Sequence, residues 1–104
     1  MEANRIETLM KMVEIDPSDS FAKYALGLEY NSVKDNDKAI EIFEGLISDD
    51  PNYLAVYYQL GKIYESQGDI EIAKKIFEKG IYVATSQNEF HTREELQQAL
   101  EELL

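Results

Sequence analysis

The chain has no cysteine and only one histidine, His91, among its 104 residues. The absence of cysteine excludes disulfide bridges, thiolate zinc sites and cysteine nucleophiles. One histidine is too few for the convergent ligands of a metal centre, so we expect His91 to have a surface or capping role, with no metal and no other cofactor. The sequence also lacks a Gly-rich phosphate loop and a nucleophile motif, and nothing marks two carboxylates as an acid–base pair. These absences predict a protein that is not an enzyme.

Long apolar runs and basic residues are also scarce. No segment approaches the roughly 18 consecutive apolar residues of a membrane-spanning helix, and the first residues lack the apolar run of a secretory signal. Lys and Arg number 10 against 21 Asp and Glu, which gives a net charge of −11. Such a surface repels nucleic-acid phosphates and anionic lipid headgroups, because both require cationic contacts. We therefore expect a cytoplasmic protein that binds neither nucleic acid nor membranes.

The sequence does contain one pattern twice, with a spacing of 34 residues. Each copy follows Asp-Pro and reads Leu-Gly-x-x-Tyr and then Ala-x-x-x-Phe. The signature positions, for which we expect structural roles, are Leu26, Gly27, Tyr30, Ala39, Phe43, Pro51, Leu60, Gly61, Tyr64, Ala73 and Phe77. Shifting residues 16–47 onto 50–81 gives further identities, among them Tyr24 with Tyr58. The chain is therefore built from an internal repeat.

This period and signature resemble the tetratricopeptide repeat (TPR) family, whose unit is a helix–turn–helix. The resemblance implies an all-α fold, in which about six helices form antiparallel hairpins stacked as a superhelical solenoid within a single domain. Apolar stripes and the repeat limits divide the chain into a half-repeat helix over residues 1–16, a first repeat over 20–50, a second repeat over 54–84 and a capping helix over 88–104. The small residues of the signature let paired helices approach closely, and a larger side chain there should overpack the contact.

The turns and the capping helix carry more local signals. Gly68 suits a left-handed turn between the helices of the second repeat, whereas Lys34 stands at the equivalent place in the first. Thr92-x-x-Glu95 matches a capping box that would begin the last helix. The sequence leaves open whether Phe90 lies in the linker or marks an earlier helix start. We expect the outer side of this helix to be polar, with Arg93, Gln97, Gln98, Glu101 and Glu102.

In TPR proteins, the first helices of successive repeats line a concave groove that receives a peptide or a partner helix. The resemblance implies that the corresponding groove positions in this sequence are Phe21, Tyr24, Leu28, Asn31, Tyr58, Gln59, Lys62 and Glu65. Tyr24 and Tyr58 have an alternative role, which is to pack between neighbouring first helices or under the capping helix. The sequence leaves both roles open for Tyr24 and favours the groove for Tyr58.

One subgroup of the family clamps the terminal carboxylate of chaperone tails through Lys and Asn side chains. Tyr24, Leu28 and Gln59 stand at those positions here, and the negative charge of the chain disfavours an acidic tail. We therefore predict a non-enzymatic interaction module whose protein or peptide partner is apolar or basic. The alternative is a homodimer formed through the groove or through the C-terminal cap, where Ala99, Leu100, Leu103 and Leu104 are apolar.

Overall fold

The computed structural model describes residues 2–104, with side chains from residue 4 onward. Its helices are α1 (Glu2–Ile15), α2 (Ser20–Ser32), α3 (Asn36–Asp49), α4 (Ala55–Ser66), α5 (Ile70–Ser86) and α6 (Phe90–Glu101). These residues contain no strand, which confirms the predicted all-α class with six helices. The helices divide into two compact units, one up to Tyr53 and one from Leu54 onward. No helix in the described range has the length and apolar character that crossing a membrane requires.

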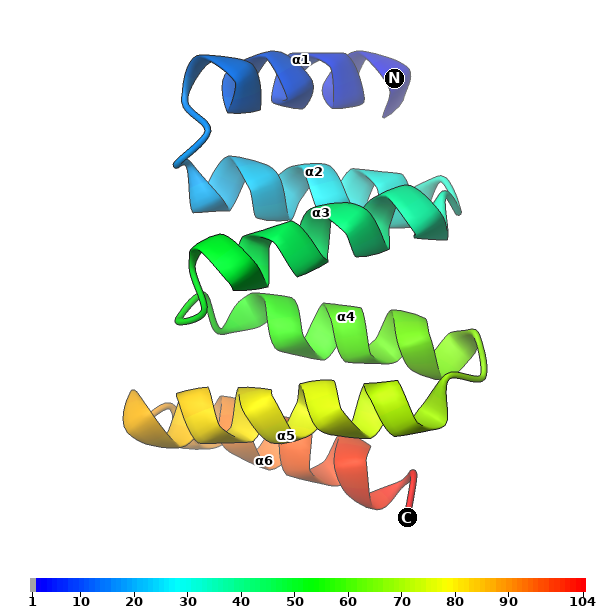
Figure 1. The fold of residues 1–104 in the computed structure, drawn as a ribbon, viewed down its shortest axis with the longest axis vertical. Helices are drawn as coiled ribbons and strands as arrows, with labels where there is room; N and C mark the ends of the chain where they lie inside the picture. The colour runs from blue at the N-terminus through cyan, green and yellow to red at the C-terminus, as the bar shows by residue number, and fades with distance from the viewer. Residues whose placement is uncertain (1) are drawn as a thin grey trace. The chain divides into compact units, whose positions relative to one another are not determined.

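The first unit consists of α1, α2 and α3, in which successive helices run in opposite directions (Figure 1). Its core lies between α2 and α3, and its buried side chains are Ala22, Leu26, Ala39, Phe43 and Leu46. The two helices approach closely at Gly27, where an added Cβ would overlap the ring of Phe43. This contact confirms the role expected for the small signature residue. Helix α1 packs on α2 with half-buried side chains only.

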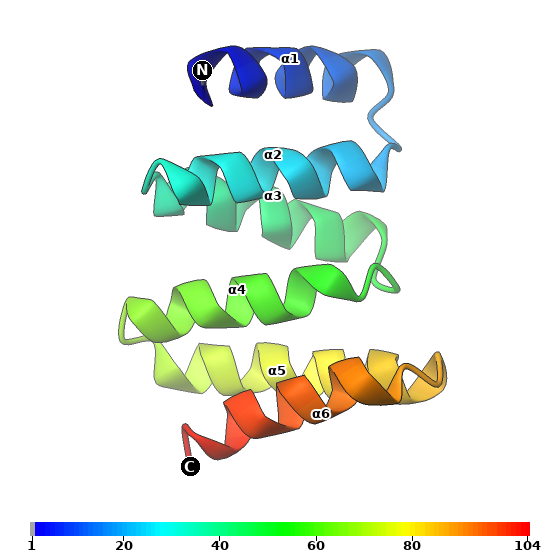
Figure 2. The ribbon, with the colours of Figure 1, turned by 180° about the vertical axis from the view of Figure 1, so that it is seen from behind.

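The second unit consists of α4, α5 and α6, which also run in alternating directions, with α6 packed on α5 (Figure 2). Gly61 lies against Phe77 as Gly27 lies against Phe43 in the first unit. A further close approach occurs at Gly80 of α5, where an added Cβ would lie 2.7 Å from Tyr57 Cβ and 3.0 Å from Leu96 Cδ1. Because Gly80 has no side chain, both α4 and α6 can approach α5 closely at this residue. The fully buried Leu96 holds α6 in this position.

Three turns, after α2, α4 and α5, end the preceding helix in the same way. Each contains a residue with positive φ, namely Lys34 at 65°, Gly68 at 83° and Asn88 at 59°. In each, the next N–H donates to a carbonyl five residues earlier, from Asp35 to Tyr30 (2.9 Å), Asp69 to Tyr64 (3.0 Å) and Glu89 to Ala84 (2.9 Å). This is the left-handed helix ending that favours glycine. The turn expected at Gly68 is confirmed, and Lys34 adopts the same conformation without glycine's freedom.

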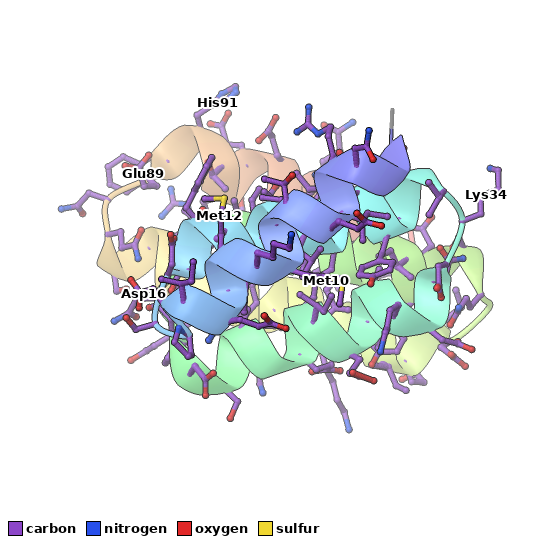
Figure 3. All side chains as sticks on the ribbon, turned by 90° about the horizontal axis from the view of Figure 1, so that it is seen from above. Met10, Met12, Asp16, Lys34, Glu89 and His91 are labelled. Carbon is purple, nitrogen blue, oxygen red and sulfur yellow. The ribbon has the colours of Figure 1, made fainter. Side chains whose placement is uncertain are left out.

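We expect Lys34→Gly to stabilise the protein. Lys34 is exposed at the tip of its turn, and Figure 3 shows its side chain pointing away from the helices. The substitution removes the strain of a non-glycine residue in the left-handed conformation. The greater conformational entropy of the unfolded chain offsets part of this gain. The free energy of unfolding should therefore rise by about 0.5–1 kcal/mol. Chemical denaturation measures the change. The matched control is Lys75→Gly on the exposed side of α5, which should destabilise by about 1 kcal/mol. A loss of stability in Lys34→Gly would contradict the described turn.

The start of α6 differs from the sequence expectation. The helix begins at Phe90, and the backbone N–H of Arg93 already donates to the carbonyl of Glu89 at 3.0 Å. Thr92 therefore lies inside the first turn, and the predicted capping box is wrong. The cause is the turn at Asn88, which ends α5 and starts the next helix at once. Phe90 marks the earlier helix start, and its ring lies 4.8 Å below the guanidinium of Arg93.

Candidate functional site

Tyr58 of α4 is the aromatic residue around which a surface cleft of the second unit is built. Its side chain is 36% exposed, and its ring lies 6.3 Å from the ring of Phe77 in a tilted arrangement. Beside it lies a cleft of about 200 Å³, whose lining residues are Tyr58, Glu95, Gln98, Ala99 and Glu102. All except Tyr58 come from one face of α6 and its C-cap residue Glu102, where residues three and four apart are neighbours. We call this site the Tyr58 cleft.

Lys62 and Glu65 continue the α4 surface beyond Tyr58. The Lys62 ammonium lies 3.2 Å from Glu65 Oε1 and 6.0 Å from the centroid of the Tyr58 ring. The hydrogen bond to Glu65 is the main cause that raises the pKa of Lys62, and Glu102 of α6 adds to the effect. Lys62 is therefore cationic throughout the neutral range, but Glu65 already balances its charge. The carboxylates of Glu95 and Glu102 remain as a negative rim on the α6 side of the cleft.

The only histidine of the chain lies next to this rim. His91 Nε2 is 3.7 Å from Glu95 Oε2, and its side chain is 87% exposed. Figure 3 shows it projecting outward from the start of α6. Among the described residues no group of three or more His, Asp or Glu side chains is arranged to hold a metal ion. His91 thus acts here as a surface neighbour of Glu95.

The first unit presents a different surface at the repeat-related positions of α2. Phe21 is 68% exposed, whereas Leu28 and Asn31 are half-buried. Tyr24 is also half-buried, and its ring centroid lies 5.9 Å from that of Phe43 and 5.5 Å from that of Tyr53. Tyr24 is therefore part of a cluster of three rings. Burial in this cluster raises the pKa of the Tyr53 hydroxyl.

The two tyrosines related by the repeat have different surroundings. Tyr24 and Tyr58 each contact the Phe of their own second helix. The third ring of the first unit, Tyr53, corresponds to position 87, which is glutamine. The second unit therefore has two of the three rings of this cluster. Tyr58 lines the cleft with residues of α6, and Lys62 Nζ lies 6.0 Å from its ring centroid.

The structure distributes the predicted groove residues over both units. Phe21, Tyr24, Leu28 and Asn31 lie on α2, and Tyr58, Gln59, Lys62 and Glu65 lie on α4. Within the second unit, Tyr58, Lys62 and Glu65 share one face, while Gln59 is half-buried. A groove that joins the α2 and α4 residues stays a prediction.

Sequence reasoning missed the contribution of α6 to the cleft. Gln98 and Glu102 were expected on the outer side of a capping helix, and both are exposed, but they also line the cleft with Tyr58. Glu95 was expected to belong to a capping box and is also a lining residue. Their spacing of three and four residues along α6 indicated a shared face. It did not indicate which helix that face would meet.

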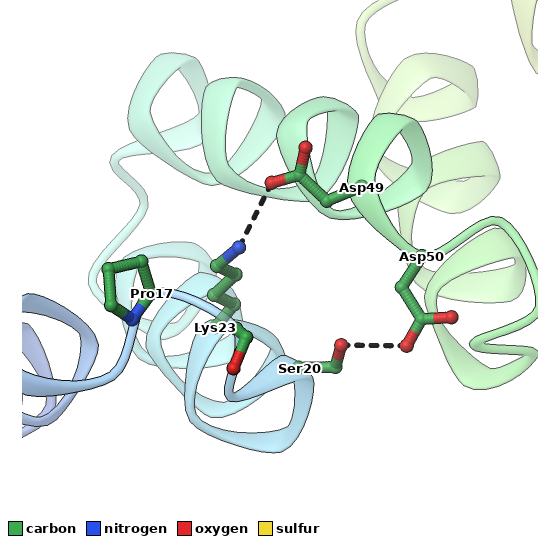
Figure 4. A pocket seen from close by; sticks show the side chains of 6 residues that line it. Pro17, Ser20, Lys23, Asp49 and Asp50 are labelled. Atoms are coloured by element: carbon green, nitrogen blue, oxygen red, sulfur yellow. Dashed lines mark hydrogen bonds and ion pairs between the residues drawn. The ribbon is translucent and has the colours of Figure 1, made fainter.

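A second hollow, of about 390 Å³, lies in the first unit at the start of α2 (Figure 4). Ser20 Oγ donates to Asp50 Oδ2 at 2.7 Å, and Lys23 Nζ bonds Asp49 Oδ2 at 3.0 Å. Asp49 and Asp50 therefore join the end of α3 to the first turn of α2. Because these polar groups bind one another, we interpret this hollow as structural.

A family model described as Tetratricopeptide repeat matches residues 32–100, which is more than half of the chain. The chain belongs to the tetratricopeptide repeat family. A TPR domain protein from Salinibacter ruber, solved by NMR, is 35% identical to it over 85% of this chain and 89% of that chain, with a TM-score of 0.80. No curated protein sequence matches the chain.

Two further solved TPR-like structures are similar in fold alone. The complex of the TPR2B domain of yeast Sti1 with pHsp70 has a TM-score of 0.90 at 15% identity, and covers 98% of this chain and 82% of that one. PcrH in complex with the chaperone binding region of PopD has a TM-score of 0.91 at 16% identity, and covers 98% of this chain and 77% of that one. At such identities the likeness carries no residue-level correspondence.

Proposed function

We propose that this TPR protein is a non-enzymatic interaction module that binds a segment of another protein on the α4 face. The observation that carries the proposal is the exposed ring of Tyr58 beside the cleft that α6 completes. Tyrosine is well suited to recognition, because it is large, stiff and amphipathic and contributes strongly when a partner covers it. The α2 positions predicted from the repeat, Phe21, Tyr24, Leu28 and Asn31, are a separate candidate contact surface of the first unit.

The surface and the similar structures support a protein or peptide partner. Sti1 TPR2B and PcrH are each solved with a segment of another protein, so binding of a peptide or helix is a natural use of this fold. An exposed aromatic ring with carboxylates nearby favours an apolar or basic segment. We place the module in the cytoplasm, since a chain without cysteine needs no oxidising compartment in order to fold.

A homodimer through the groove or the cap is the alternative. Of the apolar residues in the C-terminal segment, Ala99 is buried, Leu100 and Leu103 are half-buried, and Leu104 is 83% exposed. This segment offers little apolar area for self-association, and the net charge of −11 makes two copies repel. Light scattering over a concentration series tests the alternative, and a stable dimer would favour it.

The decisive substitution is Tyr58→Ala. We expect it to weaken binding of a peptide selected from a random display library by about tenfold or more, because central aromatic contacts commonly exceed 1.4 kcal/mol. Loss of the Phe77 contact and of the buried part of the ring should cost about 2–3 kcal/mol of stability. The control is Tyr82→Ala on α5, where the ring is 77% exposed and outside the cleft, and binding should stay unchanged. If Tyr58→Ala unfolds the protein, or if both variants bind alike, the surface is assigned wrongly.

A further inference from the structure

We infer that the Tyr58 cleft binds a cationic side chain, from an arginine or lysine in a basic partner peptide. This rests on the proposed function of the α4 face and names the chemistry that the face selects.

The Tyr58 ring indicates where the partner group lies. In the first unit, the ring of Tyr53 lies 5.5 Å from that of Tyr24. The second unit has no aromatic residue at the equivalent position 87, and Tyr58 lines the cleft with Lys62 Nζ 6.0 Å from its ring centroid. A guanidinium or ammonium group is attracted to an aromatic face at up to about 6 Å from the ring centre. The partner group would contact Tyr58 from the cleft, next to Lys62.

The charge of the rim selects the sign of that group. Glu95 and Glu102 of α6 line the cleft, and the Glu95 side chain is 57% exposed. Lys62 is paired with Glu65 at 3.2 Å on the α4 side, so its charge is balanced there. Glu102 is near enough to Lys62 to help raise its pKa, so Lys62 offsets part of the rim charge. The carboxylates of Glu65, Glu95 and Glu102 outnumber this cation, and a guanidinium fits such oxygens well.

The size of the cleft selects a side chain rather than a small molecule. Its volume of about 200 Å³ lies below the range of about 300–1,000 Å³ typical of small-molecule sites. An anion, including the terminal carboxylate of a peptide, would meet Glu95 and Glu102. A long cationic side chain can instead lay its apolar stem on Tyr58 and Ala99 and place its charge at the rim.

The test is an NMR titration of the full chain with three short blocked peptides of equal length. One alternates leucine with arginine, one leucine with glutamine and one leucine with glutamate. We expect the arginine peptide to shift the amide signals of α4 and α6 around Tyr58 and Ala99 in a saturable way. The glutamine peptide should bind more weakly at the same place, and the glutamate peptide should not bind.

Two matched double variants separate a specific site from general attraction to an acidic protein. Glu95→Gln with Glu102→Gln removes the rim charges, and we expect the arginine peptide to bind about fivefold more weakly. Glu94→Gln with Glu101→Gln removes the same charge from exposed residues of α6 that do not line the cleft, and should change the affinity by less than about twofold. Lys62→Gln should tighten binding, because it removes the nearest like charge.

Each failure has a distinct meaning. Equal losses in both double variants, or weaker binding in Lys62→Gln, would overturn the cationic anchor. If the glutamine peptide binds the Tyr58 cleft as well as the arginine peptide does, the anchor is wrong while the proposed function of the face stands. If no peptide of any charge shifts the α4 and α6 signals, and display selection gives no binder that Tyr58→Ala weakens, the proposed function fails as well.

Discussion

Leu96→Ala should lower the free energy of unfolding by about 2–5 kcal/mol, the range typical of a fully buried leucine. Leu96 has no exposed surface and lies where α6 meets Gly80 of α5, at a contact too close for a Cβ at position 80. The cavity left by alanine cannot be filled from α5, because Gly80 offers no side chain. Thermal and chemical denaturation of the full chain measure the loss.

The same variant should also weaken any ligand of the Tyr58 cleft. Helix α6 supplies Glu95, Gln98, Ala99 and Glu102 to its lining, so a loosened α6 opens the cleft. The control is Leu104→Ala, the same change in the same terminal segment at a residue that is 83% exposed. It should shift stability by no more than about 0.5 kcal/mol. Similar losses in both variants would show that α6 is not held by Leu96.

Gly27→Ala should destabilise the protein by about 1–3 kcal/mol, although alanine is the better helix former. An alanine Cβ at this position would overlap the ring of Phe43, and two of the ring carbons would lie 2.7 Å away. Phe43 is fully buried, so its ring cannot turn aside without disturbing the α2–α3 core. The expected gain in helix propensity, about 1 kcal/mol, is too small to compensate.

Gly45→Ala provides the control within the same unit. Gly45 lies on the exposed side of α3, and an added Cβ meets nothing within 4 Å. Here only the propensity changes, so the free energy of unfolding should rise by about 0.5–1 kcal/mol. Opposite signs for the two glycines are the expected result, read by chemical denaturation. A stabilised Gly27→Ala variant would mean that the two helices are further apart than described.

Much of the fold could be predicted because the same contact residues occur in both copies of the repeat. Gly27 with Phe43 and Gly61 with Phe77 occupy identical positions in the two copies, and the structure places them in identical contacts. The left-handed turn at Gly68 was predictable from the residue type. The start of α6 could not be predicted in this way. Thr92 and Glu95 have the spacing of a capping box, but the turn at Asn88 sets where the helix begins.

The candidate site could be predicted only in its α4 half. Tyr58, Lys62 and Glu65 follow from the repeat register, and the structure shows them on one face of α4. Glu95, Gln98 and Glu102 stood outside the repeat pattern and were assigned to a capping box or to the outer side of the cap. Their position beside Tyr58 depends on how α6 packs against its neighbours, which is not encoded in any single helix.

The sequence by itself therefore determined the family, the helical class and the paired small and aromatic residues of each hairpin. It did so because helical periodicity and the repeat period specify which residues share a face. The tertiary structure alone decided that Tyr24 is covered by Tyr53 and that Tyr58 faces α6. The physical reason is that the exposure of a ring depends on which neighbouring helix or turn packs over it. The copies also differ at one equivalent position, which is tyrosine at 53 and glutamine at 87.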